Sequence, residues 1–223
     1  MRPPGELRER EGKMGLIFEK GQKVLFVGDS ITDCGRRELG LGLGVGYVRD
    51  IGGILGARHP ELGLELVNMG VSGDTVRELA GRWERDVIEQ RPDWVSVAIG
   101  INDVWRQVRG ESSGVSVEEF EATYQRLLER TRETVRSRFI LMETTVIREA
   151  LEDGANEMLK PYNRAIRKLA KESGAVLVPM NREWHRAIRG NPGVKWTTDG
   201  VHPGVAGHGL MARVWLNAVG FKW

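Results

Sequence analysis

The chain has 223 residues, a length typical of one α/β domain or two small ones. Its 33 basic and 31 acidic residues are interleaved and leave a net charge of +2, so no cationic run predicts a nucleic-acid surface. The single cysteine, Cys34, excludes an internal disulfide and favours a reducing compartment. No stretch reaches the ~20 apolar residues of a membrane span, so we expect a cytoplasmic protein that binds neither membrane nor nucleic acid.

The N-terminal sequence MRPPGELREREGKMG is polar and charged, and it lacks the apolar segment of a secretion signal. We expect residues 1–15 to form a flexible extension ahead of a single domain over residues 16–223. Met14 is a second candidate for the start of the natural chain.

Five short runs rich in Val, Ile and Leu predict β-strands. The runs occupy residues 23–27, 64–69, 94–99, 139–143 and 175–179. Because apolar residues do not alternate cleanly with polar ones in these runs, we expect helices to cover both faces of the sheet.

Amphipathic helical patterns separate these runs. Apolar residues recur at helical spacing over residues 76–88, 117–135 and 158–169. A last helix is expected over residues 203–218, because the proline at its start suits a first helical turn. Strands that alternate with helices are typical of a parallel sheet joined by right-handed crossovers.

Polar clusters follow the first three predicted strands and precede the last predicted helix. The clusters are GDS at 28–30, NMGVSGD at 68–74, GIND at 100–103 and DGVHP at 199–203. Function in such sheets gathers at the carboxyl ends of the strands, near the point where the strand order reverses. We therefore expect these four segments to meet on one rim of the sheet.

Three residues of these clusters have the chemistry of a catalytic triad. A serine hydroxyl is a weak nucleophile until a base removes its proton, and Ser30 is the candidate nucleophile. His202 is the candidate base, because imidazole titrates near neutral pH. Asp199 lies three residues before His202 and is the candidate carboxylate that orients the imidazole and stabilises its charged form.

The segments GDSI, GVSGDT, GIND and DGVHP, in this order and spacing over residues 28–203, resemble the four sequence blocks of the SGNH hydrolases, also called GDSL esterases. The longer stretches GDSITDCG, PDWVSVAIGINDVWRQ and VHPGVAGH are similar to the bacterial xylan acetylesterases of that family. The resemblance implies a three-layer α/β/α sandwich of the flavodoxin-like kind, whose five parallel strands have the order 2-1-3-4-5.

The resemblance also implies an oxyanion hole, the set of donors that meets the negative charge developing on the ester oxygen. Its donors would be the backbone N–H groups of Ser30 and Gly70 and the side-chain amide of Asn102. These residue types suit the role, since glycine permits close approach and asparagine donates without carrying charge. Members of the family often form homo-oligomers, so we expect self-association.

We therefore expect a serine carboxylic ester hydrolase that acts through an acyl-enzyme without a cofactor. Similarity to xylan acetylesterases points to acetyl groups on short xylo-oligosaccharides as substrate. A general short-chain esterase, a thioesterase and a lysophospholipase use the same chemistry and remain open. A non-catalytic carbohydrate-binding protein on the same fold is the alternative from another class.

Several residues beside the triad have either a structural or a functional interpretation. Asp29 and Asp103 are short acids suited to hydrogen-bonding loop N–H groups, and Asp29 is also a candidate contact for substrate. Trp105 and Trp196 flank the catalytic segments, where they would wall the substrate pocket or pack in the core. We expect Asp74 to cap the helix that follows it.

Other motifs carry less weight. The four histidines are accompanied by no cysteine pair and no H-E-x-x-H, so we expect no metal site. GESSG at 110–114 matches the G-x-S-x-G elbow, but no strand precedes it, which predicts a surface loop. The glycine-rich run at 40–46 fits no nucleotide-binding pattern and predicts a flexible loop beside Ser30.

Overall fold

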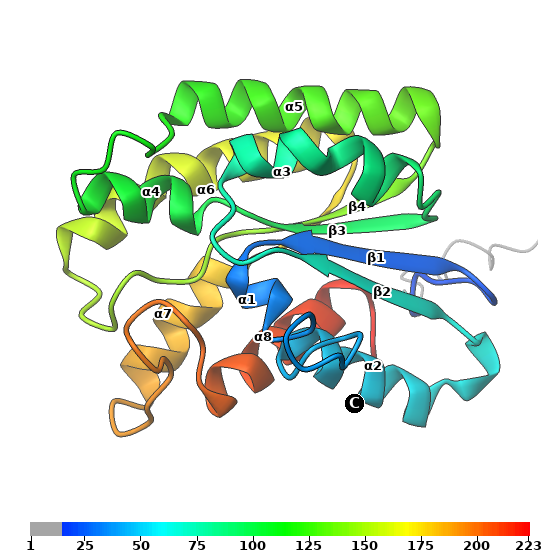
Figure 1. The fold of residues 1–223 in the computed structure, drawn as a ribbon. Helices are drawn as coiled ribbons and strands as arrows, with labels where there is room; N and C mark the ends of the chain where they lie inside the picture. Colours follow the sequence, from blue (N-terminus) through cyan, green and yellow to red (C-terminus); the bar gives the residue numbers. More distant parts are fainter. Residues whose placement is uncertain (1–14) are drawn as a thin grey trace, which may run out of the picture.

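The computed structural model describes residues 15–223 and is built on one five-stranded parallel sheet (Figure 1). The strands are β1 Lys23–Gly28, β2 Glu65–Gly70, β3 Trp94–Ala98, β4 Arg138–Met142 and β5 Val176–Val178. Their order, β2-β1-β3-β4-β5, confirms the predicted topology. Apart from its last residue, the predicted N-terminal extension lies outside the described residues.

Helices cover both faces of the sheet, as the apolar strands predict (Figure 1). One face carries α3 Val76–Trp83, α4 Ile101–Val108, α5 Val117–Thr134 and α6 Gly154–Ser173. The other carries α2 Tyr47–Arg58, α7 Met180–Gly190 and α8 Val205–Ala218. The short helix α1, Ser30–Asp33, follows β1 directly, and a π-helical turn, Glu84–Ile88, continues α3. β1 and β3 lie between the two layers, and their burial explains why their sequences do not alternate.

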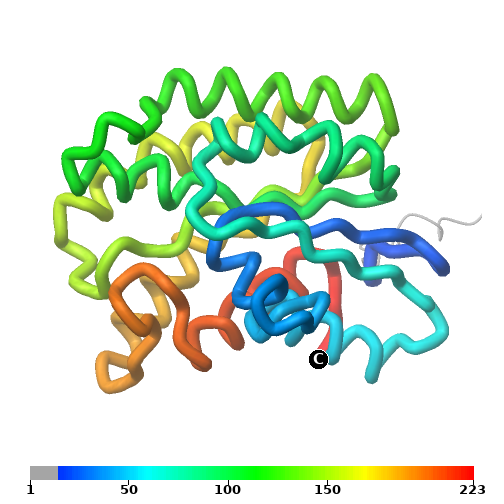
Figure 2. Tube along the Cα trace, viewed as in Figure 1, coloured from blue at the N-terminus to red at the C-terminus, as the bar shows by residue number. Residues whose placement is uncertain are grey.

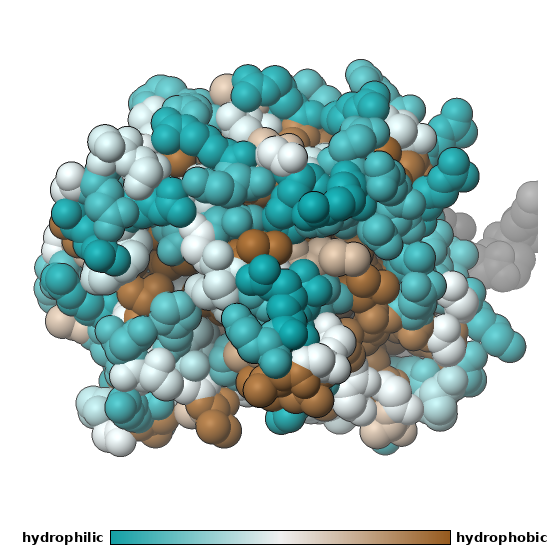
Figure 3. Space-filling model, in the orientation of Figure 1, coloured by the Kyte–Doolittle hydropathy of each residue, from teal (hydrophilic) through white to brown (hydrophobic). Residues whose placement is uncertain are grey.

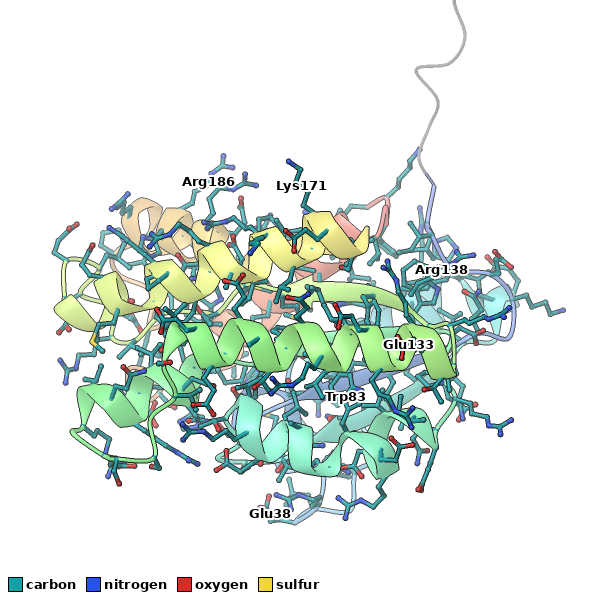
Figure 4. All side chains as sticks on the ribbon, turned by 90° about the horizontal axis from the view of Figure 1, so that it is seen from above. Glu38, Trp83, Glu133, Arg138, Lys171 and Arg186 are labelled. Carbon is teal, nitrogen blue, oxygen red and sulfur yellow. The ribbon has the colours of Figure 1, made fainter. Side chains whose placement is uncertain are left out.

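Tryptophans anchor the helical layers on both faces of the sheet. The indole of Trp215 packs on Phe26 and donates to Ser96 Oγ at 2.9 Å. On the opposite face Trp83 lies between α3 and α5 (Figure 4) and donates to Thr131 Oγ1 at 2.8 Å. The N–H groups of these two buried indoles therefore have partners, which offsets the cost of taking them out of water.

Four α-helices of the described residues were not predicted from the sequence, namely α1, α2, α4 and α7. α2 contains Gly52, Gly53 and Gly56, which lower helix propensity, and its helical state rests on one buried face. α4 and α7 are short, with eight and eleven residues, and each buries only three side chains. α8 begins two residues later than predicted, after Gly204.

The predicted capping role of Asp74 is wrong. Thr75 caps α3, because its hydroxyl accepts the Arg77 N–H and Glu78 accepts the N–H of Thr75, forming a capping box. The Asp74 carboxylate instead accepts a hydrogen bond from Arg82. Two adjacent candidates for one cap cannot be separated by residue type alone.

The turn after β1 packs tightly against the neighbouring strand. A Cβ at Gly28 would lie 2.3 Å from the carbonyl oxygen of Ala98 and 2.5 Å from Thr32 Oγ1. Only glycine lets β1 end here without moving β3 or α1. The close contact brings the residue after Asp29 to the point where the strand order reverses.

We expect Gly28→Ala to lower the free energy of unfolding by about 1–3 kcal/mol, because overpacking forces the backbone to shift. Gly53→Ala is the matched control, since a Cβ at this exposed position of α2 meets nothing within 4 Å. It should raise stability by about 0.5–1 kcal/mol, because alanine favours the helix. Urea unfolding followed by circular dichroism measures both, and a neutral Gly28→Ala would contradict the tight contact.

Candidate active site

Ser30 stands at the first position of α1, immediately after β1. Asp29 caps this helix by accepting the Ile31 N–H at 3.0 Å. The Thr32 and Asp33 N–H groups bond the Asp29 carbonyl, whereas the Ser30 N–H has no acceptor among the described residues. The nucleophile candidate is therefore held on a rigid turn with its own N–H left available.

A closed loop before α8 carries Asp199 and His202 and lies beside α1 in the fold (Figure 2). Thr197 and Pro203 form a bridge at its base, and the Thr198 N–H bonds the His202 carbonyl at 2.8 Å. These contacts within the loop fix its shape before any contact with the rest of the chain is counted.

Two contacts from outside the loop fix its position. Glu149 accepts both the N–H and the hydroxyl of Thr197, and the Arg148 N–H bonds the Gly200 carbonyl at 2.6 Å. The segment after β4 thus determines where the loop lies, although the sequence patterns did not mark Arg148 and Glu149 as part of the site.

The structure brings the three predicted triad residues together. Ser30 Oγ lies 2.9 Å from His202 Nε2, and His202 Nδ1 lies 2.7 Å from Asp199 Oδ2. Since the carboxylate accepts, Nδ1 carries the proton and Nε2 is left to accept the serine proton. This is the donor–acceptor order that activation of a serine requires.

Asp199 is fixed in its ionised form. Partial burial raises its pKa, but hydrogen bonds from the N–H and imidazole of His202 and from the Val201 N–H outweigh that effect and lower the pKa to about 2. The carboxylate therefore stays charged at neutral pH, where it can orient the imidazole and balance its positive charge.

Asn102 lies at the start of α4, directly after β3, and is part of the same rim. Its Nδ2 donates to the Asp74 carbonyl oxygen at 2.9 Å. That bond uses one of the two amide N–H groups, and the other has no acceptor among residues 15–223. Asn102 therefore has a donor available, as the predicted oxyanion role requires.

Gly70 does not fit its predicted role. Its N–H donates to Asn68 Oδ1 at 2.8 Å and is not available to an oxyanion. A Cβ at Gly70 would lie 2.2 Å from the Asp33 nitrogen, so this glycine serves the packing of β2 against α1. Three residues on, Gly73 has a positive φ of 88° and an N–H without an acceptor in the described part of the chain.

Asp29 is also excluded from its predicted contact with substrate, because it is only 2% exposed. Asp29 and Asp103 instead bond backbone N–H groups, as predicted, although these belong to helix starts and not to loops: Ile31 of α1 for Asp29 and Val76 of α3, at 3.0 Å, for Asp103. Burial raises the pKa of each to about 7. The charge of Asp103 adds to the rise at Asp29, and the charge of Glu78 adds to the rise at Asp103. One oxygen of Asp103 has no hydrogen-bond partner among the described residues.

The two tryptophan candidates differ in position. Trp105 lies one turn after Asn102 on α4, is partly exposed, and has the Arg148 guanidinium over its ring at 5.8 Å. Trp196 packs edge-on against Trp184 and lines a groove between α7 and α8 that includes none of the triad residues. Only Trp105 remains a candidate for substrate contact.

The remaining predictions concern loops and metal ions. GESSG at 110–114 forms an exposed turn after α4, and the 40–46 loop lies beside α1, where the Val45 N–H bonds the Cys34 carbonyl. Within residues 15–223 no group of three or more His, Cys, Asp or Glu side chains is arranged to hold a metal ion. In the same residues no helix is long and apolar enough to cross a membrane.

Comparison with known proteins agrees with the fold. Residues 26–210 match the GDSL-like lipase/acylhydrolase family. An acetylxylan esterase of Geobacillus stearothermophilus is 43% identical over 211 residues, covering 91% of this chain and 96% of that protein.

Solved structures give the same result. The crystal structure of an acetylxylan esterase from Geobacillus stearothermophilus matches with a TM-score of 0.86 at 40% identity, covering 93% of this chain and 98% of the other. An α/β hydrolase enzyme from the metagenome of Lake Arreo, Spain, matches with a TM-score of 0.84 at 38% identity, covering 92% and 98%.

These matches and the fold define a carboxylic ester hydrolase of the α/β/α type. The chain belongs to the GDSL-like lipase/acylhydrolase family, as the order of its four sequence blocks predicted.

The raised pKa of Asp103 makes stability depend on pH. From an ordinary value of 3.8 the folded-state pKa rises to about 7, so the folded protein retains a proton that the unfolded chain releases. The stability from this proton is complete below the unfolded pKa and is lost as the pH rises through about 7.

The wild type should lose unfolding free energy as the pH rises from 5 to 8. In Asp103→Asn this loss should be smaller by about 1–3 kcal/mol, because the amide has no proton to release. Urea unfolding at pH 5 and pH 8 measures the unfolding free energy of both proteins. Glu111→Gln, on the exposed turn after α4, is the control and should leave the difference unchanged. An equal pH dependence in wild type and Asp103→Asn would contradict a protonated Asp103.

Proposed function

We propose that this chain hydrolyses carboxylic esters through an acyl-enzyme on Ser30. The observation that carries the proposal is the continuous hydrogen-bonded line from Ser30 Oγ through His202 to Asp199, with steps of 2.9 and 2.7 Å. It lies at the carboxyl ends of β1 and β3, on the rim that also carries three N–H groups with no acceptor among residues 15–223: those of Ser30 and Gly73 and the second amide N–H of Asn102.

In the first step Ser30 Oγ attacks the acyl carbon while His202 Nε2 takes its proton. Negative charge then moves to the carbonyl oxygen, where the N–H groups of Ser30 and Gly73 and the free amide N–H of Asn102 stabilise it. Gly73 replaces Gly70 in this proposal because the Gly70 N–H is already bonded to Asn68. Each such donor is worth about 10²–10³ in rate.

Collapse of the tetrahedral intermediate expels the alkoxide, which leaves with the proton carried by His202. Water then enters, loses a proton to the same imidazole and attacks the acyl-serine. The second tetrahedral intermediate releases the carboxylic acid and restores Ser30. Asp199, ionised throughout, stabilises the imidazolium in both halves of the cycle.

The substrate class we propose is acetylated xylo-oligosaccharides. The support is the similarity to acetylxylan esterases over 91% of the chain, together with a solved relative described as an acetyl-xylooligosaccharide esterase. Trp105, partly exposed beside Asn102, offers an aromatic face on which a sugar ring can stack.

We further propose a single domain over residues 16–223, a cytoplasmic location and self-association. One sheet joins all the described strands, and the one cysteine suits a reducing compartment. Figure 3 shows apolar surface over the loop between α1 and α2, where Leu39 and Leu41 are more than half exposed. Exposed apolar surface of this kind supports contact with a second copy, which light scattering of the purified protein tests.

Ser30→Ala should lower kcat for p-nitrophenyl acetate by at least about 10³-fold, because a triad acts as a unit. His202→Ala should cost as much, and Asp199→Asn somewhat less. Melting temperature is the control for folding in all three variants. Wild type should also form a covalent fluorophosphonate adduct at Ser30, and a protein that only binds carbohydrate would form none.

Acyl and sugar preference separates the proposed substrate from its rivals. Rates of release from acetylated xylobiose, an acetyl ester and an octanoyl ester of the same alcohol should fall in that order. Trp105→Ala should raise KM for acetylated xylobiose about tenfold, because it removes roughly 1.4 kcal/mol of stacking energy. The KM for p-nitrophenyl acetate, which has no sugar ring, should stay unchanged. A tenfold preference for octanoyl over acetyl esters would exclude the sugar substrate and favour a lipid or thioester.

A further inference from the structure

The guanidinium of Arg82 lies beneath the rim that carries the proposed oxyanion donors. Arg82 is on α3, and its side chain is only 9% exposed. One nitrogen, Nη2, donates to the Gly28 carbonyl at 3.0 Å, and another, Nη1, donates to the Met69 carbonyl at 2.7 Å. These carbonyls belong to the last residue of β1 and the next-to-last residue of β2, its neighbour in the sheet, so one side chain holds the ends of both strands.

The same guanidinium reaches the loop that follows β2. Its Nε donates to Asp74 Oδ2 at 2.6 Å, and Nη1 also donates to Asp86 Oδ2 at 2.9 Å. Two carboxylates thus balance one buried cation, which removes the penalty of an unpaired charge. The planar fork of arginine suits four acceptors in fixed directions, whereas a lysine ammonium does not.

The position of Asp74 in turn determines the direction of the Asn102 amide, because its backbone carbonyl accepts one Asn102 N–H at 2.9 Å. With that bond made, the second N–H of the planar amide has only one direction left. From the other side of the same loop, Asp33 Oδ2 accepts the N–H of Ser72 at 3.1 Å. The turn that carries Gly73 therefore lies between two fixed anchors.

We propose that Arg82 is a positioning residue of the oxyanion hole, acting through Asp74 on Asn102 and through the two strand ends on Ser30. The proposal rests on the proposed function, since it concerns the donors named there. Arg82 touches no reacting atom. It holds the donors within the small fraction of an ångström that stabilisation of a transition state requires.

Arg82→Lys tests the proposal, with Arg85→Ala as matched control. Arg85 pairs with the same Asp86 but is 71% exposed and bonds neither strand end. Active sites are first titrated with a fluorophosphonate, so that kcat refers to folded enzyme only. For Arg82→Lys we expect kcat per titrated site to fall at least about tenfold with KM for p-nitrophenyl acetate within twofold.

Inhibition by phenylboronic acid gives a second readout. Ser30 Oγ adds to boron and passes its proton to His202, which leaves a tetrahedral anion whose oxygen occupies the oxyanion position. In Arg82→Lys the inhibition constant should rise by about the same factor as kcat falls, because both depend on the same donors. A merely structural role would lower the titrated fraction and leave kcat per site and the inhibition constant unchanged.

Arg85→Ala should match wild type in both measurements. A change of less than threefold in both kcat per site and the inhibition constant of folded Arg82→Lys would overturn the proposal. If Arg82→Lys yields no folded protein, Asp74→Ala is tested in the same assays. We then expect kcat per titrated site to fall at least fivefold, and a fall of less than twofold would overturn the proposal. Inactive wild type would instead overturn the proposed function itself.

Discussion

The close approach of the α1 turn to the sheet is the constraint on which the site depends. β1 and β2 are neighbours in register, and both end on glycine. Side chains at Gly28 and Gly70 would overlap the Ala98 carbonyl and the Asp33 nitrogen, so α1 rests directly on the strand ends. Ser30 consequently projects from the rim at the reversal of strand order, where β3 delivers Asn102 and the loop before α8 delivers His202.

Buried polar side chains make this approach stable. The loops around Ser30 contain backbone groups that no helix or strand satisfies, and Asn68, Asp33, Asp103 and Arg82 bond them instead. Each bond is worth only about 1 kcal/mol net, but leaving such a group unpaired costs more. The geometry of the rim is therefore determined by side chains that never reach the substrate position.

The sequence predicted the parts of this arrangement that local patterns record. Buried strands leave short apolar runs, and chemistry-bearing residues follow them at fixed places, so the strands and the meeting of Ser30, Asp199 and His202 were predictable. The order of the strands was predicted from the resemblance to the SGNH hydrolases. Partners far apart in the chain leave no local pattern. By residue type, Asn68 is as suitable for the site as its neighbours. Its side-chain oxygen, however, accepts the Gly70 N–H, which is then not available to an oxyanion.

The same limit explains the other differences. Arg82 lies in an ordinary amphipathic helix, outside its apolar stripe, and only the folded chain shows that its guanidinium bonds the ends of two strands. Trp196 stands close to Asp199 in sequence but packs on Trp184. α2 was not predicted, because its three glycines weaken the helical sequence pattern that its buried face would otherwise show.

The triad is open to bulk solvent, since the side chains of His202 and Asp199 are 47% and 56% exposed. On the proposed mechanism this exposure determines the fate of the acyl group. Water reaches the acylated serine from many directions and at far higher concentration than any sugar hydroxyl. Transfer of the acyl group to a second carbohydrate is therefore outcompeted, and an ester bond broken on this rim is not rebuilt elsewhere.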